Sequence, residues 1–569
     1  MRAGVSRALP LLEPLERRVL LDGVSPLPAE PLVLDEAVSV VVAGERGVQL
    51  EIGRFLSGRA FEASASADGG DVVDVTLPVR LSVFDSTDVR LRLGDVFSDN
   101  GFDLEGGNLI RIHMPIDIEV LYSDRVTVEA EDFFSDNTFT WSGGSGNVRI
   151  EMPVSITVVG SQDVIVNVED VFGDASFAWR MEVTGSAGMR SAPTPRGVFD
   201  LVMPIGFNID RSSRVLVDVE DLVGDNMWRW EGAGAALGPG SSGEAAGFRL
   251  MADMPLNLSV HRSLQSEIDV EDVFGDNDFR WDIAPPPEVA EGGRYGIGGG
   301  FDVRGTSRFE IWQSTDVLID VEDTFGDSDF RWRGGAGGAG RAADRGAMFR
   351  FQAPQTFGVY AGSQAEINVE DVGGDNDWSW TADEAAGQPA PLLFTAPVSY
   401  EVTDSVEVSI DTEDFVGDND LSRRGSEAPS RPGPKDVPRP VFIDAGLSVG
   451  VWFGERVSVD VEDVFGNNNL LDRLAGVRAD RAAGVASGAV SVPVSVVQPV
   501  RLLIDGGRSN VVEAATVFGG NTFRYGEAER AVPLAALSRV VLPGTRERAA
   551  SESSRIGFGR SGVGNRVLV

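Results

Sequence analysis

An acidic and aromatic stretch, Glu271–Trp281, reads Glu-Asp-Val-Phe-Gly-Asp-Asn-Asp-Phe-Arg-Trp and recurs in varied form along most of the chain. We define the anchor of each copy as the Asp of its Glu-Asp pair; Gly94 replaces the Glu in the first copy. The anchors are Asp95, Asp132, Asp170, Asp221, Asp272, Asp323, Asp371, Asp414, Asp463 and, in degenerate form, Thr516. Intervals of 37 to 53 residues between them are typical of repeat architectures.

The spacing within each copy is more constant than the spacing between copies. A proline lies 17 residues before the anchor in eight of ten copies, and an aromatic residue lies nine after it in seven. A large apolar residue, such as Phe177 or Trp228, lies seven residues after each anchor. Only the Gly-, Ala- and Ser-rich connector from the aromatic to the next proline changes in length, so insertions are tolerated at one edge of the unit.

The pattern inside one unit predicts β-strands. Val154, Ile156 and Val158 alternate with polar residues, and Val164, Val166 and Val168 form a second alternating series. Period-two alternation of β-branched residues indicates half-buried strands. The Gly-Asp-Asn segment predicts a tight turn in which Gly and Asn adopt positive φ. We therefore expect about ten units of three strands each, with the proline capping the first strand.

A single unit of this kind cannot bury its apolar face, whereas stacked neighbours can. The expected fold is all-β and elongated. Insertions confined to one corner favour a parallel β-solenoid over an antiparallel meander, which the tight turns favour; a closed propeller of ten blades ranks third. The expected segments are a sorting segment at 1–25, an N-terminal capping region at 26–77, the array at 78–530 and a disordered tail at 531–569. A weaker copy lies near Phe55.

Composition excludes several classes of function. The net charge is −39 and Lys435 is the single lysine, so nucleic acid and anionic membrane surfaces are not expected partners. No apolar run is long enough for a membrane span. The chain has no cysteine, which excludes disulfides and thiolate metal sites. The acidic balance suits solubility and the binding of cations.

The N-terminus contains Leu-Glu-Pro-Leu-Glu, then Arg17-Arg18-Val19, then Leu-Leu, all within Leu12–Leu21. This segment closely resembles the LEPR-XLL motif at the N-terminus of large, repeat-rich bacterial surface proteins. The resemblance covers about 15 residues and departs at Asp22, where a small residue is more usual. It implies export to the cell surface or the extracellular space and implies nothing about what the repeats do. A short amphipathic helix without a role in export is the alternative.

The anchor aspartates raise a question of burial. In strict alternation Val168, Asp170 and Phe172 share one face, and an unpaired buried carboxylate is costly. Three arrangements resolve this: a bulge that shifts the register and lets the Asp cap backbone N–H groups in the turn, an ion pair with an arginine, or a cation between carboxylates. The turn arrangement is favoured.

The cation arrangement has its own supporting pattern, because three carboxylates surround the turn in four copies. Ca²⁺ takes six to eight oxygen ligands from such groups. The predicted Ca²⁺ ligands are Asp272, Asp276 and Asp278; Asp323, Asp327 and Asp329; Asp371, Asp375 and Asp377; and Asp414, Asp418 and Asp420.

The remaining residues that carry chemistry favour a non-catalytic protein. His113 and His261 occupy different places in their repeats and are expected to be solvated strand residues. The recurring Trp is expected in the core rather than as a platform for sugars. Acids that repeat in every unit do not resemble a unique catalytic pair. We therefore expect an exported structural or adhesive scaffold, bound to a cell-surface or matrix polymer. The alternatives are a carbohydrate-active β-helix lyase or hydrolase, and a Ca²⁺-dependent secreted module.

Overall fold

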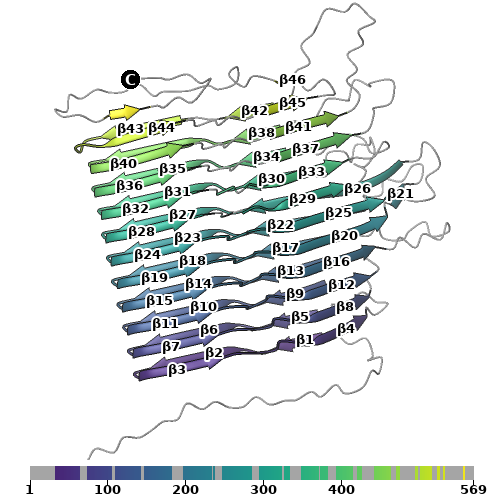
Figure 1. Ribbon diagram of the computed structural model, residues 1–569, viewed down its shortest axis with the longest axis horizontal. Coiled ribbons are helices and arrows are strands. Elements are labelled where there is room, and N and C mark those ends of the chain that lie inside the picture. Colours follow the sequence, from purple (N-terminus) through teal and green to yellow (C-terminus); the bar gives the residue numbers. More distant parts are fainter. Residues whose placement is uncertain are drawn as a thin grey trace, which may run out of the picture.

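The chain forms a parallel β-solenoid in a computed structural model (Figure 1). The structure describes residues 32–64, 73–105, 109–142, 147–181, 196–233, 235–237, 246–284, 294–322, 324, 326–333, 348–370, 372–373, 375–381, 392–413, 420–425, 441–462, 469–474, 494–497, 500–515, 522–525, 530–531 and 555–557. These residues form strands and turns and contain no helix. Segments 1–25 and most of 531–569, including the LEPR-XLL-like motif, lie outside them.

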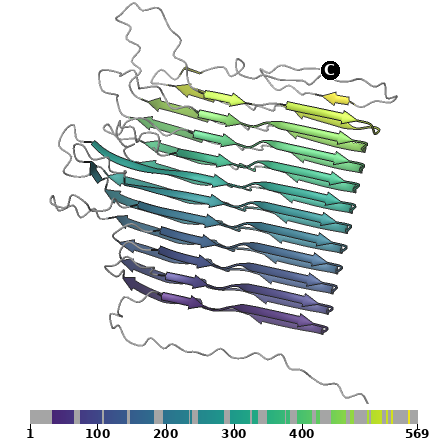
Figure 2. The ribbon, with the colours of Figure 1, turned by 180° about the vertical axis from the view of Figure 1, so that it is seen from behind.

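Four sheets run the length of the solenoid, and each coil contributes one strand to each sheet in chain order, S1, S2, S3 and S4 (Figures 1 and 2).

Sheet S1 contains β1 (Leu32–Asp35), β5 (Val73–Thr76), β9 (Leu109–His113), β13 (Asn147–Glu151), β17 (Arg196–Val202), β22 (Ala246–Asp253), β26 (Arg294–Arg304), β30 (Met348–Gln352), β34 (Leu392–Thr395), β38 (Val441–Asp444) and β42 (Val494–Val497), with the short β21 (Ala235–Leu237) antiparallel to β26. Sheet S2 contains β2 (Val38–Ala43), β6 (Val79–Phe84), β10 (Ile116–Leu121), β14 (Val154–Val159), β18 (Ile205–Asp210), β23 (Leu256–His261), β27 (Ser307–Trp312), β31 (Gln355–Tyr360), β35 (Val398–Thr403), β39 (Leu447–Trp452) and β43 (Val500–Asp505).

Sheet S3 contains β3 (Arg46–Ile52), β7 (Thr87–Leu93), β11 (Asp124–Ala130), β15 (Gln162–Val168), β19 (Ser213–Val219), β24 (Leu264–Val270), β28 (Thr315–Val321), β32 (Ser363–Val369), β36 (Val406–Thr412), β40 (Glu455–Glu462), β44 (Val511–Ala515) and β47 (Arg555–Gly557). Sheet S4 contains β4 (Ala60–Ser64), β8 (Gly101–Glu105), β12 (Thr138–Ser142), β16 (Ser176–Met181), β20 (Met227–Ala233), β25 (Asp278–Ala284), β29 (Asp329–Arg333), β33 (Asp377–Thr381), β37 (Asp420–Gly425), β41 (Asn469–Leu474), β45 (Thr522–Tyr525) and β46 (Arg530–Ala531).

The solenoid prediction is confirmed, but each coil has four strands rather than three. The additional strand lies in S1 just before the proline, as β13 does before Pro153, at the end of the segment that the sequence pattern identifies as the variable connector. Val148 and Ile150 of β13 point inward, and this short alternation is its sequence signal. The proline immediately precedes the S2 strand, as Pro153 precedes β14.

The array also begins earlier than residue 78. β1 to β4 form a complete first coil between Leu32 and Ser64, so the weak copy near Phe55, in the segment expected to be a capping region, is a full unit of the array. The eleven coils are stacked in register: Val154 of β14 lies opposite Ile116 on one side and Ile205 on the other. At the C-terminal end, β47 pairs with β44, so residues 555–557 of the predicted tail extend sheet S3.

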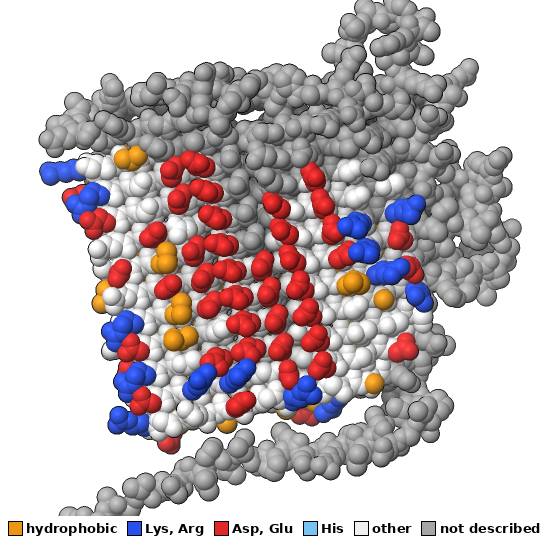
Figure 3. Space-filling model, in the orientation of Figure 1, with side chains coloured by type: hydrophobic (Ala, Val, Ile, Leu, Met, Phe, Trp, Pro, Cys, Tyr) orange, Lys and Arg blue, Asp and Glu red, His pale blue; other side chains and the backbone are white. Residues whose placement is uncertain are grey.

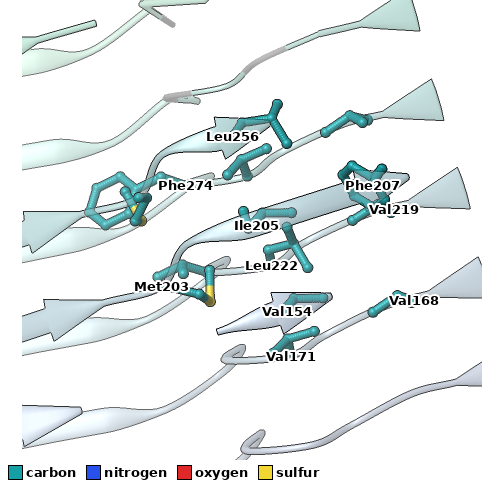
Figure 4. Close-up of a cluster of buried hydrophobic side chains, with 14 of the residues drawn as sticks. Val154, Val168, Val171, Met203, Ile205, Phe207, Val219, Leu222, Leu256 and Phe274 are labelled. Atoms are coloured by element: carbon teal, nitrogen blue, oxygen red, sulfur yellow. The ribbon is translucent and has the colours of Figure 1, made fainter. Parts of the chain in front are cut away.

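The core is continuous along the solenoid. Between S2 and S3 it is mainly aliphatic, with a stack of buried rings at Phe309, Phe357 and Tyr400 of S2. Figure 4 shows Ile205 and Val154 of S2 beside Leu222 and Val171, which lie in the turns after the S3 strands. Each such buried side chain contributes about 1.5–3 kcal/mol.

On the S4 side the core is aromatic. The rings seven residues after each anchor stack from coil to coil, with centroids 4.7 Å apart for Phe139 and Phe177 and 4.1 Å apart for Phe177 and Trp228. Trp179, Trp230 and Trp281 are each no more than 4% exposed and border a small apolar hollow with Leu250 and Phe301. The expectation that the recurring Trp belongs to the core is therefore confirmed for these residues.

Candidate functional site

Carboxylates are arranged in columns along one face of the solenoid, where the S3 strands end and the chain turns toward S4 (Figure 3). In-register stacking produces these columns, because each repeat places its acids one coil, roughly 4.8 Å, from those of the next. The column three residues before the anchor contains Glu129, Asp218, Asp269, Asp320, Asp411 and Asp460, and the column one residue before it contains Glu131, Glu169, Glu220, Glu271, Glu322, Glu370, Glu413 and Glu462. We call these two columns, the anchors and the turn aspartates together the acidic face.

The anchor lies in the turn, outside the strand. Val168 is buried, Glu169 and Asp170 are half-exposed, and Val171 and Phe172 are both buried, so the alternation shifts at the Glu-Asp pair. The described anchors have φ of 46° to 53°, a left-handed conformation that Asp adopts more readily than most residues. The predicted change of register at this pair is therefore confirmed.

The turn residues have different roles from those expected. The second residue with positive φ is the Asp four positions after the anchor, such as Asp174 at 50°. The glycine three residues after the anchor instead leaves space for the anchor side chain, because a Cβ on Gly173 would lie 2.8 Å from Oδ1 of Asp170.

The Asn five positions after the anchor is buried and links coils. Its Nδ2 donates to a backbone carbonyl of the preceding coil, as from Asn277 to Val223 at 2.7 Å. Its Oδ1 accepts from a backbone N–H of that coil, as from Asn226 at 3.2 Å.

Burial and neighbouring negative charges both raise the pKa values of carboxyl groups in the acidic face. Burial, followed by the charges of Asp221 and Asp132, raises the pKa of Asp170 to about 7. Burial, followed by Glu271 and Asp320, raises the pKa of Asp269 to about 6. Burial also raises the pKa of Asp221, with smaller effects from Asp225 and Asp276. Like charges at this spacing make the charged form less favourable.

Arginine pairing resolves the anchor charge at the N-terminal end. Nε of Arg54 lies 2.9 Å from Oδ2 of Asp95. Elsewhere on the surface, arginines and acids alternate from coil to coil, as where Arg214 donates to both carboxylate oxygens of Asp163. Such exposed pairs each contribute roughly 0–1 kcal/mol.

The predicted Ca²⁺ ligands are distributed among three columns. Asp272 and Asp276 lie in the turn with positive φ, whereas Asp278 begins β25 and accepts a hydrogen bond from Nε of Arg280 at 2.9 Å. Oδ1 of Asp327 accepts the backbone N–H of Asp375 in the next coil at 3.0 Å, which is a capping contact. Asp278, Asp329, Asp377 and Asp420 form one column along S4, and Asp329 is paired with Arg331.

Asp323, Asp371, Asp414 and Asp418 lie outside the described residues. Among the residues that are described, no group of three or more carboxylates or histidines has an arrangement that could hold a metal ion. The strand register aligns the described acids between coils rather than within one turn, as it does Asp278 and Asp329.

Both histidines lie on outer strand positions, as expected. Nδ1 of His113 is 3.3 Å from Oε2 of Glu151, and His261 stacks against Trp312.

A buried serine column nine residues before the anchor was missed. The hydroxyl of Ser161 accepts the backbone N–H of Ser123 at 3.1 Å and donates to the carbonyl of Val159 at 3.0 Å. The serine recurs as Ser86, Ser123, Ser161, Ser212, Ser263, Ser314 and Ser405, so its constant distance from the anchor was the available signal.

Ala175 occupies the position five residues after the anchor, where Asn226 and Asn277 lie in the next two coils, and this difference yields a prediction. Ala175 donates its N–H to Asn226 at 3.0 Å but offers no amide to the preceding coil. Replacing Ala175 with Asn should restore that link and raise the free energy of unfolding by about 0.5–1.5 kcal/mol in urea titrations. The reverse change in a neighbouring coil, Asn226→Ala, should lower it by about 1–3 kcal/mol. Destabilisation by Ala175→Asn would show that the site has no room for an amide.

The fold and the columns define the protein as a parallel β-solenoid with eleven coils and an acidic face. Comparison with protein-family models, curated proteins and solved structures finds no match. No helix in the described part of the chain is long and apolar enough to cross a membrane.

Proposed function

We propose that the chain is a non-catalytic, exported bacterial protein of the cell surface or extracellular matrix, in which the solenoid is a stiff structural or adhesive scaffold. The observation that carries this proposal is the uniform stacking: all four sheets continue through eleven coils in register. A rod with repeating faces presents the same groups at every coil, which suits multivalent contact with a polymer. The LEPR-XLL-like segment supports the exported location.

The enzyme alternative requires a unique cluster of exposed reactive groups. The nearest feature is Asp302 on S1, which is 3% exposed and lies beside Arg249, Arg304 and Arg350. Burial opposes ionisation of Asp302, but hydrogen bonds from Arg304 and Arg249 outweigh it and hold the pKa below its ordinary value. A covered carboxylate clamped by arginines is poorly suited to acid-base chemistry, so this cluster favours a structural role.

Export can be tested in the native bacterium by fractionating cells that produce the tagged chain. We expect the full chain in the surface or extracellular fraction and a chain lacking residues 1–25 in the cytoplasm. Removal of residues 558–569 is the matched control and should not change location. Retention of the full chain in the cytoplasm would contradict the proposed function.

A Ca²⁺-dependent module is the second candidate, supported by the raised pKa values of stacked carboxylates such as Asp170 and Asp269. A divalent cation between coils would relieve their repulsion. We expect 5 mM Ca²⁺ to raise the melting temperature above that in chelator, with Asp170→Asn reducing the effect. Equal melting temperatures with Ca²⁺ and with chelator would remove this candidate.

A further inference from the structure

The outer face of S2 contains one group of side chains that does not repeat. The second and fourth positions of the S2 strands hold mainly polar residues, charged residues and glycines, such as Ser155, Glu119 and Gly206. The last position of the S2 strand instead holds Trp312, Tyr360, Thr403 and Trp452 in four successive coils. Tyr360 and Trp452 therefore lie on opposite sides of Thr403.

Both flanking rings lean back along their strands over glycines. A Cβ on Gly358 would lie 2.5 Å from the ring of Tyr360, and a Cβ on Gly450 would overlap the indole of Trp452. Gly358 and Gly450 are the two cross-strand neighbours of Glu401. The phenol and the indole thus lie on the two sides of the Glu401 side chain.

Glu401 itself is exposed and held by its neighbour. The pKa of Tyr360 is raised by burial and then by Glu401, to which its hydroxyl is hydrogen-bonded. One ion pair on this face joins Arg308 to Glu310, two coils away, and another joins Arg80 to Asp117 near the N-terminal end. Among the described residues, no arginine forms an ion pair with Glu401. The carboxylate and the two electron-rich ring faces all make the local electrostatic potential negative, and this potential favours the binding of a cation.

The spacing determines which cation fits. Two coil steps separate Tyr360 from Trp452 by about 9.5 Å, so a cation midway lies about 5 Å from each ring, within the roughly 6 Å range of cation–π attraction. Tyr360 stacks face to face on Trp312 with centroids 4.1 Å apart, so its faces point along the solenoid axis. That orientation does not suit a sugar lying flat on the sheet, and it suits a compact group inserted between rings.

We propose that Tyr360, Glu401 and Trp452 form a binding site for an alkylammonium group, either primary or methylated, presented by another molecule. The rings supply cation–π contacts, Glu401 supplies the counter-charge, and the two glycines keep other side chains out of the slot. The site does not depend on the scaffold function, because it rests on residues outside the repeat pattern.

The test is saturation-transfer NMR on the full chain with choline, its uncharged isostere 3,3-dimethyl-1-butanol, and Nα-acetyl-lysine methylamide. We expect choline or the lysine amide to bind and the isostere not to bind. Their relative affinities distinguish a methylated head group from a lysine side chain. Glu401→Gln and Trp452→Ala should each weaken binding about fivefold or more, consistent with loss of one cation–π or charge contact.

Trp312→Ala is the matched control, because Trp312 lies in the same column but on the far side of Tyr360. It should change affinity by less than about twofold. Circular dichroism establishes that each variant is folded, and the variants replace side chains that are at least partly exposed. Failure of both ammonium probes to bind, equal binding of the isostere, or equal losses in Trp312→Ala and Trp452→Ala would overturn the proposal.

Discussion

Replacing Trp228 with alanine is expected to lower the free energy of unfolding by about 3–5 kcal/mol, the usual cost of removing a buried aromatic ring. Trp228 is 5% exposed and stacks on Phe177 at 4.1 Å and on Phe279 at 5.7 Å. Its loss leaves a cavity in the middle of the aromatic column, and the coils above and below lose a stacking partner. Urea unfolding measures the total effect.

Because each coil contacts only its neighbours, the damage should be local. Hydrogen exchange should accelerate most in β16, β20 and β25 and least in distant strands such as β7. Trp228→Phe should cost little, since Phe177 and Phe279 fill this position in adjacent coils. Met227→Ala is the surface control: Met227 is 47% exposed, and its loss should change stability by less than about 0.5 kcal/mol. A uniform increase in exchange along the whole solenoid would contradict the nearest-neighbour picture.

The second large effect is a loss of stability as pH rises through the range in which the acidic face ionises. The pKa of Asp170 is raised to about 7 and that of Asp269 to about 6, whereas both ionise near pH 4 in the unfolded chain. Below pH 4 both states are protonated and there is no penalty. Between pH 4 and 7 the unfolded state ionises freely and the folded state does not, so stability falls as pH increases.

Thermal melts from pH 5 to pH 8 should therefore show a falling melting temperature. At pH 8, Asp170→Asn should stabilise the protein by about 1–2 kcal/mol, a value reduced from the full shift because the carboxyl is half-exposed and screened. Asn also tolerates the left-handed backbone of Asp170, which has φ of 48°.

Asp302→Asn is the control of opposite sign, because the pKa of Asp302 is lowered. This change should destabilise the protein at pH 8 by removing the charge that the neighbouring arginines share. A melting temperature that does not vary between pH 5 and 8, or a destabilising Asp170→Asn, would show that burial and neighbouring charges do not raise the pKa of these carboxyl groups in the folded state.

Periodicity predicted a stacked β-repeat array, and the confinement of insertions to one corner favoured the solenoid over the meander. The alternation of Val164, Val166 and Val168 and the constant distance from anchor to Phe177 are both satisfied when copies stack in register, and the structure stacks them in that way. The burial of Trp179 and Trp230 followed from the same argument. Two structural features were not predicted, because their sequence signals span only a few residues. These features are the S1 strand before each proline and the single serine at a fixed distance from the anchor.

What the sequence determined by itself was local: which residues alternate, where the chain turns, and that acids recur at fixed places in each unit. Only the tertiary structure decided how those acids meet. Carboxylates close in sequence, such as Asp272, Asp276 and Asp278, are separated into different columns, while acids many residues apart become neighbours. The physical reason is that backbone hydrogen bonds between parallel strands hold equivalent residues one coil apart, a distance that local sequence cannot encode.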